Sequence, residues 1–279
     1  MDLNLVLLTH QDALRLSFFV GLFFLVATFE WLKPRRNHAA SRKIRWLNNF
    51  SLVVLASLLV RLIVPMGLVA FAIKVQSSGW GLFNYLQINH WQMNGGLIII
   101  LALVILDFAI YWQHRIFHVV PMLWRLHRVH HSDSVFDVTT AVRFHPLEIV
   151  LSIFIKATLV VVLGIPAVAI IAFEIILSGV ALFNHGNLAL PIKLDAIIRT
   201  LIVTPDMHRV HHSDIPAETN SNYGFNLSIW DRIFGSYLGQ PQKGHEEMNI
   251  GLKEFPKQAQ TIRLLALLKM PFIGASKQG

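Results

Sequence analysis

The stretch His127-Arg128-Val129-His130-His131 decides how this chain must fold, because the same five residues return as His208-Arg209-Val210-His211-His212. In an α-helix, positions i, i+3 and i+4 share one face, so each copy is expected to direct three imidazole rings into one small volume. His114 and His118 form a further i, i+4 pair just before the first copy. These clustered histidines predict helices that gather a metal site, and eight imidazoles suit two metal ions.

A purely structural role is the alternative, since an isolated histidine pair often caps a helix or faces solvent. Repetition disfavours that role, because buried imidazoles need hydrogen-bond partners and protonated ones repel each other. The chain contains no cysteine, which excludes thiolate-bound haem, cysteine-held iron–sulfur clusters and cysteine-type zinc sites. None of its glutamates has a histidine three residues later, unlike the di-iron carboxylate bundles. We therefore expect an almost purely imidazole ligand set, which accepts iron, zinc, copper or nickel.

Composition outside the histidine clusters is that of a membrane protein. Hydrophobic residues make up 54% of the chain, charged residues only 14%, and the mean hydropathy is +0.54. Apolar runs long enough to cross or enter a bilayer cover residues 16–32, 50–73, 96–112, 147–163 and 165–183. Arg61 and Pro65 interrupt the second run, whereas Gly164 and Pro166 punctuate the last two as a tight hairpin. The sequence predicts an all-α membrane protein with about four to five membrane-embedded helices and a histidine-rich helical cap.

The loops predict the orientation. Residues 33–45 carry six basic side chains and no acidic one, which indicates a cytoplasmic loop, whereas residues 75–96 carry no charge and are expected outside. The third run then returns to the cytoplasm, and a hairpin that enters and leaves by one face keeps all the histidine clusters there. The net charge of +8 fits anionic lipid rather than nucleic acid, because the basic residues flank the expected spans. We expect an integral membrane protein, in a bacterial inner membrane.

Several motifs in a fixed order extend the pattern. They are Asp107-Phe108-x-x-Tyr111-Trp112-x-His114-Arg115-x-x-His118, Trp124-Arg125-x-His127-x-x-His130-His131-Ser132, Arg143-Phe144-His145-Pro146-Leu147-Glu148, Asn184-His185-x-Asn187, the second H-x-x-H-H word, and Trp230-Asp231-Arg232-Ile233-Phe234-Gly235. Together they resemble the fatty acid hydroxylase/sterol desaturase superfamily over about residues 100–240. We therefore expect N-terminal spans and loops in residues 1–99, the catalytic domain in 100–240 and a cytoplasmic tail in 241–279. For this tail, an interfacial helix is one of the structures considered.

The resemblance implies an integral-membrane oxidoreductase with a histidine-held centre of two iron ions. Such enzymes use O2 and electrons from an external donor, a reductase, ferredoxin or cytochrome, to hydroxylate or desaturate a lipid C–H bond. The lipid classes implied are sterol, fatty acyl, ether lipid and isoprenoid. The alternatives are a histidine-rich metal transporter, whose ligands should line a path through the bilayer, and a bis-histidine haem protein, which needs single histidines on facing spans.

The family's histidine boxes can be placed residue by residue. They fall on His114, His118, His127, His130, His131, His208, His211 and His212, with a further histidine at His185. His145 either supplies one more ligand or begins the helix after it as a cap, because it precedes Pro146. Asp107 and Tyr111 share the helix stripe of His114 and His118, so Asp107 either orients an imidazole or is solvated at a helix end.

Other polar residues receive separate interpretations. His10, His38 and His245 lack a helical partner histidine and are expected in solvated or headgroup regions, and His90 is expected on the outer side. Arg115, Arg128 and Arg209 each follow a histidine and should reach headgroups or buried acids instead of metal. Lys156 and Glu174 lie at equal distances from the hairpin turn, so we expect them to pair across it.

Overall fold

The computed structural model describes residues 3–37, 42–88 and 95–273. In these ranges every element is helical apart from three isolated β-bridges, which confirms the all-α class. The elements in chain order are α1 (Leu3–Thr9), α2 (Gln11–Leu32), α3 (Arg42–Ile63), α4 (Gly67–Ser77), α5 (Leu82–Ile88), α6 (Gly95–Val119), α7 (Pro121–His131), η1 (Val138–Val142), α8 (Pro146–Leu163), α9 (Ala167–Asn184), α10 (Ile192–Ile198), α11 (Pro205–His211), α12 (Pro216–Thr219), α13 (Ile229–Ile233), α14 (Gly244–Glu247), α15 (Gln258–Ile262), α16 (Leu264–Lys269) and η2 (Met270–Phe272).

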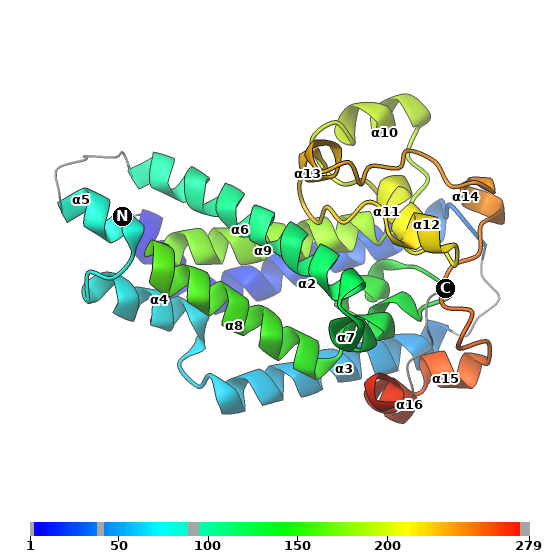
Figure 1. Ribbon diagram of the computed structural model, residues 1–279, viewed down its shortest axis with the longest axis horizontal. Coiled ribbons are helices and arrows are strands. Elements are labelled where there is room, and N and C mark those ends of the chain that lie inside the picture. Colours follow the sequence, from blue (N-terminus) through cyan, green and yellow to red (C-terminus); the bar gives the residue numbers. More distant parts are fainter. Residues whose placement is uncertain (1–2, 38–41, 89–94, 274–279) are drawn as a thin grey trace.

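Five segments of the described chain are long and apolar enough to cross a membrane: α2, the stretch Arg42–Leu86 that holds α3 to α5, α6, α8 and α9. These helices run side by side along the long axis, and the short helices α10 to α16 form a cap at one end (Figure 1). The predicted second run is broken between Ile63 and Gly67, because Pro65 cannot continue the backbone hydrogen bonding of α3.

The hairpin of α8 and α9 forms as predicted. Gly164 ends α8 in the left-handed region, at φ +70°, which favours a residue without a Cβ, and Pro166 precedes α9. The other two ends of the hairpin, at His145 and His185, both lie at the cap. The chain therefore leaves the cap along α8 and returns to it along α9.

A buried ion pair joins the two helices of the hairpin. Lys156 Nζ lies 3.1 Å from Glu174 Oε1, which confirms the predicted pair, and Arg15 of α2 lies 2.7 Å from the other carboxylate oxygen. One carboxylate thus pairs with two cations on different helices. Because removing a single partner would leave a buried charge uncompensated, the cluster fixes how α2, α8 and α9 pack.

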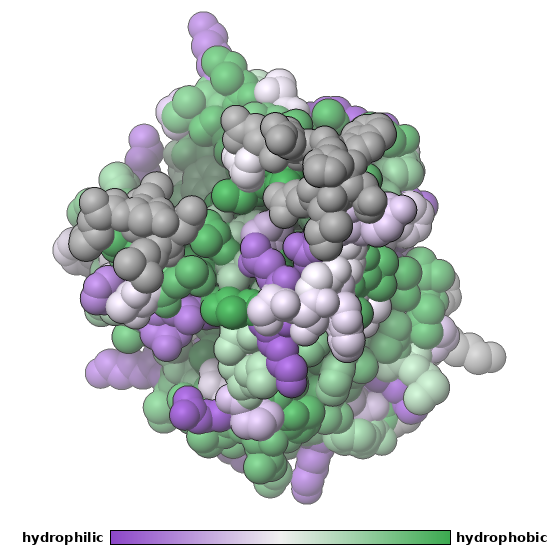
Figure 2. Space-filling view, turned by 90° about the vertical axis from the view of Figure 1, so that its left-hand side faces the viewer, coloured by the Kyte–Doolittle hydropathy of each residue, from purple (hydrophilic) through white to green (hydrophobic). Residues whose placement is uncertain are grey.

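The surface of the bundle is apolar where a membrane would contact it. On α3, the side chains of Val54, Leu58 and Leu62 are 57%, 61% and 79% exposed, although the residues are strongly hydrophobic. Figure 2 looks onto the end that carries α5 and shows hydrophobic residues over much of the surface around a patch of polar residues. A soluble monomer rarely exposes so much apolar surface, whereas a bilayer would cover it.

Buried polar contacts fasten the bundle to the cap. Arg45, near the start of α3, pairs with Asp133 (2.7 Å) and with Asp137, the residue that caps η1. Glu30 of α2 accepts hydrogen bonds from the backbone N–H groups of Val138 (2.7 Å) and Asn187 (2.6 Å). These contacts hold the loops before η1 and after α9 against the membrane helices, and both loops border the histidine clusters.

Candidate metal centre

Nine of the predicted histidines converge inside the cap end of the molecule, and all nine are buried. They form a five-histidine group (His114, His118, His127, His131 and His211) and a four-histidine group (His130, His185, His208 and His212). Within each group, one ring nitrogen from every member lies within 4.8 Å of the others. The two groups are adjacent, since the rings of His131 and His212 stack with centroids 4.5 Å apart.

The structure corrects the expectation that each H-R-V-H-H word points into one volume. In the first word, His127 and His131 belong to the five-histidine group, whereas His130 belongs to the four-histidine group. In the second word the division is reversed, with His211 alone in the five-histidine group. At 3.6 residues per turn, i and i+4 differ by about 40° around the helix, but i+3 and i+4 differ by about 100°. Each word therefore contributes to both groups.

Hydrogen bonds at Nδ1 set the tautomers of several rings. The Nδ1 atoms of His114, His185 and His211 lie 2.7–2.8 Å from the backbone carbonyl oxygens of Tyr223, Ala181 and Ser221. A carbonyl oxygen can only accept, so these nitrogens carry the proton and each Nε2 keeps its lone pair. The Nε2 atoms of His114 and His211 then lie 3.0 Å apart with a lone pair on each. A cation between them would remove this repulsion.

Protonation is unfavourable throughout both groups. Burial lowers the pKa of His127 to about 3 and that of His185 to about 4. Burial also brings the pKa of His130, His131, His208, His211 and His212 well below the ordinary histidine value, and neighbouring histidines add to the effect. Both ring nitrogens of His118, His131 and His212 are buried without a hydrogen-bond partner in the described part of the chain. Neutral imidazoles with free, convergent lone pairs fit the ligand set of two metal ions.

His145 lies outside both groups. Its Nδ1 accepts a hydrogen bond from the backbone N–H of Leu147 (3.2 Å), and its Nε2 lies 3.3 Å from the carbonyl oxygen of Leu268. The residue is the N-cap of α8, immediately before Pro146 at the first helical position. Of the two roles expected for His145, the structure therefore shows helix capping and corrects its assignment as a ligand.

Asp107 and Tyr111 form hydrogen bonds with residues other than the clustered histidines. Asp107 is buried and accepts hydrogen bonds from Trp230 Nε1 (2.8 Å) and from the backbone N–H of Leu227 (3.2 Å). It therefore takes neither of the two roles considered for it, contact with an imidazole or solvation at a helix end. The Tyr111 hydroxyl bonds to Ser236 Oγ at 2.9 Å. Both side chains fasten the segment after α12, which carries the carbonyl of Tyr223 that orients His114.

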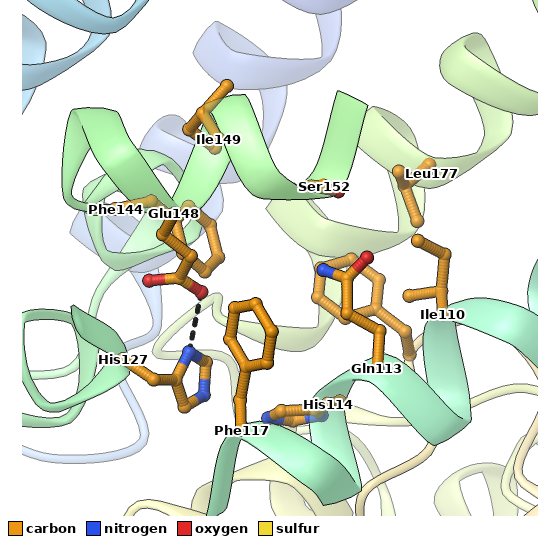
Figure 3. Close-up of a pocket in the computed structure, with 11 residues that line it drawn as sticks. Ile110, Gln113, His114, Phe117, His127, Phe144, Glu148, Ile149, Ser152 and Leu177 are labelled. Atoms are coloured by element: carbon orange, nitrogen blue, oxygen red, sulfur yellow. Dashed lines mark hydrogen bonds and ion pairs between the residues drawn. The ribbon is translucent and has the colours of Figure 1, made fainter. Parts of the chain in front are cut away.

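Glu148 is the acid that sequence reasoning missed. Its Oε1 lies 2.7 Å from His127 Nδ1, and both side chains are buried (Figure 3). Nδ1–H donation to a carboxylate leaves Nε2 of His127 free for a metal and makes it a stronger ligand. Two signals were available, since Glu148 ends the Arg143–Glu148 motif and lies in the first turn of an apolar helix. Neither links it to His127, because 21 positions separate the two residues and no helical spacing joins them.

The predictions for the arginines and the isolated histidines have different outcomes. Arg209 pairs with the half-buried Asp206, and Arg128 lies 3.7 Å from the half-buried Glu254, as expected for arginines that point away from the ligands. His245 was expected to be solvated, but it is buried with its Nε2 3.7 Å from Asp206 Oδ2. His10 is exposed, whereas His38 and His90 lie outside the described residues.

A cavity of about 100 Å³ adjoins the five-histidine group between α6, α8 and α9 (Figure 3). It is lined by Ile110, Gln113, His114, Phe117, His127, Phe144, Glu148, Ile149, Ser152, Leu177 and Phe225. Most of these side chains are apolar, and the Gln113 side chain extends from α6 towards α8. Gln113 Oε1 is buried with no hydrogen-bond partner among the described residues, so it is free to accept one from a ligand. A molecule in this cavity would contact two of the candidate metal ligands, His114 and His127.

Comparison with known proteins identifies the family. Residues 99–236 match the fatty acid hydroxylase family model. The chain belongs to the fatty acid hydroxylase superfamily. It is 29% identical to the ornithine lipid hydroxylase OlsE of Rhizobium tropici over 81% of this chain and 67% of that protein. It is 27% identical to the alkylglycerol monooxygenase of Danio rerio over 81% of this chain but only 47% of the relative.

A plant relative carries a different activity in its name. The very-long-chain aldehyde decarbonylase GL1-7 of Oryza sativa is 25% identical over 62% of this chain and 28% of its own length. No solved structure matches the chain. The segment shared with the fatty acid hydroxylase family contains all nine clustered histidines together with Glu148, whereas α1 to α5 and the buried His245 lie outside it.

Proposed function

We propose that the protein is an integral-membrane monooxygenase that uses O2 and two histidine-bound iron ions to hydroxylate a C–H bond of a membrane lipid. The observation that carries the proposal is the apolar cavity between membrane helices, which ends on His114 and His127 of the five-histidine group. Two of the similar proteins are named for hydroxylation or monooxygenation of lipids, which favours hydroxylation over desaturation. Iron is preferred because an all-imidazole site accepts it and the chemistry requires a redox-active metal.

The proposed ligands are the nine histidines of the two groups. Two iron ions in these positions would supply the reductive activation of O2 that an unactivated C–H bond requires. The protein prepares the site in advance: carbonyl groups hold the rings of His114, His185 and His211 in one tautomer, and Glu148 does the same for His127. Burial keeps the rings neutral, and the apolar lining of the cavity limits the access of water to the reacting carbon.

Hydroxylation inserts one oxygen atom into the C–H bond and reduces the other to water, so it consumes two electrons and two protons. In this proposal an external donor, a reductase, ferredoxin or cytochrome, supplies those electrons at the cytoplasmic face. The organisation then follows the expected division, with spans and loops in 1–99, the catalytic domain in 100–240 and a cytoplasmic tail in 241–279. Leu265 of α16 and Phe272 of η2 expose 63% and 69% of their surface near the end of the described chain, which suits an interfacial segment formed by α16 and η2.

The cytoplasmic orientation, in a bacterial inner membrane, rests on the basic loop after α2. Arg35 reaches Asp206 (3.4 Å) and Glu246 (2.8 Å) of the cap, so this loop lies at the histidine end of the molecule. Basic loops favour the cytoplasmic side. Reporter fusions after Arg45 and Gly239 should therefore read cytoplasmic, and a fusion near Gln87 should read external. A cytoplasmic reading at Gln87 contradicts the orientation.

Metal content and oxygen incorporation test the proposal together. The purified protein should contain about two irons per chain without haem absorption bands, since the site offers two imidazole groups. Reduced in the presence of isotopically labelled O2 and membrane lipid, it should give a lipid product carrying one labelled oxygen atom. Zinc or copper in place of iron, with metal uptake into vesicles and no labelled lipid, would instead support a metal transporter.

A further inference from the structure

A second hollow shares part of its lining with the cavity beside the histidines. It has a volume of about 330 Å³ and lies between α3, η1, α8 and α9. Four side chains line both spaces: Phe144, Ile149, Leu177 and Phe225. We name this second space the α3 hollow.

Side chains, not backbone, separate the two spaces. The four shared residues all keep partial exposure, although they are large and apolar and lie among the membrane helices. The surface that they expose is therefore in part the surface of the two spaces that they line. Phe144 also stacks on the ring of His130, with centroids 4.4 Å apart and planes within 7°. Small rotations of such side chains would join the spaces into one passage, because aliphatic and aromatic rotamers interconvert rapidly where there is free space.

The polarity of the passage changes from one end to the other. Near the histidines, Gln113, Glu148 and Ser152 contribute polar atoms to the lining. In the α3 hollow, Ser57 and Ser178 are the only polar residues in the lining, and Ser178 already donates its hydroxyl to the carbonyl of Glu174 (2.7 Å). The passage is thus matched to a molecule whose polar part lies near the metal ligands and whose remaining part is hydrocarbon.

The helices around the α3 hollow identify the class of molecule. α3, α8 and α9 are among the segments apolar and long enough to span a membrane, so the surrounding medium supplies lipid chains. Ser57 at the edge of the hollow is exposed, and its neighbours Val54 and Leu58 lie on the exposed face of α3. Spaces of about 300 Å³ and above are typical of small-molecule sites.

We propose that the α3 hollow binds the alkyl tail of the lipid substrate, and that the chain passes Phe144 and Phe225 so that a carbon near its polar end lies beside His114 and His127. The proposal rests on the proposed function for the identity of the reacting end. It assigns the length of the accepted chain to residues of α3 that lie far from the histidines in sequence. Ala56 is the most useful of these, because it is 5% exposed and lines the hollow directly.

Binding of a homologous series of saturated 1-alkylglycerols, each with a diazirine at the chain end, tests the site without turnover. Each methylene that enters the apolar hollow should tighten binding roughly fourfold until the hollow is full. Ala56→Leu adds volume equal to about three carbons, so binding should stop improving about three methylenes earlier, with loss of up to roughly sixtyfold for longer chains. Ser57→Phe, at the edge, provides a second variant that disturbs packing less.

The matched controls are Val54→Phe and Leu58→Phe, which add comparable bulk to the exposed face of α3. Both should leave the chain-length profile and the labelled residues unchanged. In the unaltered protein, photolabelling by the longer probes should fall on α3-hollow residues such as Ile153 and Val60. A profile that is the same in Ala56→Leu, Ser57→Phe and the controls overturns the proposal, as does labelling confined to exposed faces.

Failure of the proposed function gives a different result. If the protein is not an oxygenase, labelled oxygen is absent from every lipid, but the chain-length profile and its shift in Ala56→Leu persist. If the tail site is wrong, oxygenation proceeds and the products of Ala56→Leu show the same chain-length distribution as those of the unaltered protein.

Discussion

Replacing His130 and His131 one at a time gives the sharpest test of how the two H-R-V-H-H words divide between the metal groups. The two residues are neighbours on α7, both are 1% exposed, and alanine removes the same ring from each. His130→Ala leaves three histidines in the four-histidine group, whereas His131→Ala leaves four in the five-histidine group. The second word reverses the order: His212→Ala leaves three histidines, and His211→Ala leaves four.

The expected effect on metal content follows from these numbers. Loss of groups that only support a ligand weakens metal binding about 10–100-fold, so loss of a ligand from the smaller group should cost at least about 100-fold. After gel filtration in metal-free buffer, His130→Ala and His212→Ala should retain about one iron per chain, and His131→Ala and His211→Ala should stay closer to about two.

Elemental analysis measures the content, and circular dichroism with thermal unfolding controls for folding. Because each variant removes one buried ring, all four should lose similar stability, and only the metal content should separate them. Equal metal loss in all four variants would refute the division into two groups. A loss that follows the position within the word, with His130 matching His211, would refute it as well.

Three further predictions concern the support of the site. Glu148→Gln removes the carboxylate that accepts a hydrogen bond from Nδ1–H of His127, so metal affinity should fall about 10–100-fold. Competition with a chelator measures the affinity, and helix content should stay constant. The pKa values of about 3 for His127 and about 4 for His185 lie below the value of about 6.5 in the unfolded chain, so these two residues take up protons below about pH 6.5 only when the protein unfolds. In the metal-free protein, each residue should therefore lower the free energy of unfolding by about 1.4 kcal/mol per pH unit, down to its folded pKa. Unfolding midpoints that stay unchanged between pH 7 and pH 5 would contradict this. Glu174→Gln leaves Lys156 without its acidic partner in the membrane bundle and should destabilise it by about 3–5 kcal/mol. Asp12→Asn, at an exposed acid 4.0 Å from Arg15, should have little effect in the same thermal assay.

Local spacing was enough to predict the helices and most of the site. The i, i+4 pair His114/His118 and the repeated words identified eight of the nine clustered histidines, because closely spaced histidines on one helix stay near one another even where, as in each word, they divide between the two groups. Equal distance from the turn placed Lys156 opposite Glu174, since a hairpin pairs positions symmetrically about its tip. These inferences needed only the period of a helix and the position of a turn.

What could not be predicted depends on contacts between distant elements. Glu148 reaches His127 across the interface of α8 and α7, and Asp107 turns to Trp230, which lies far along the chain. His145 matched a family motif, but the backbone of α8 required a cap at that position and the ring accepts the Leu147 N–H instead of facing the other histidines. Sequence spacing states which residues share a face of one helix, but it contains no information on which second element that face meets.

The division of each word has a structural consequence for the spacing of the two groups. His130 and His131 are consecutive on α7 with ring centroids 5.4 Å apart, and His211 and His212, at the end of α11, are 5.6 Å apart, yet each pair contributes to both groups. The distance between the two groups is therefore fixed by two pairs of consecutive residues, one on α7 and one at the end of α11, and not by flexible loops. Neither group can form unless α7 and α11 meet with their words facing each other, since each group takes histidines from both helices. A loop insertion between α7 and α11 should consequently leave the distance between the groups unchanged, whereas one residue inserted between His127 and His130 should disrupt both groups together, because it rotates His127 by about 100° relative to His130 and His131.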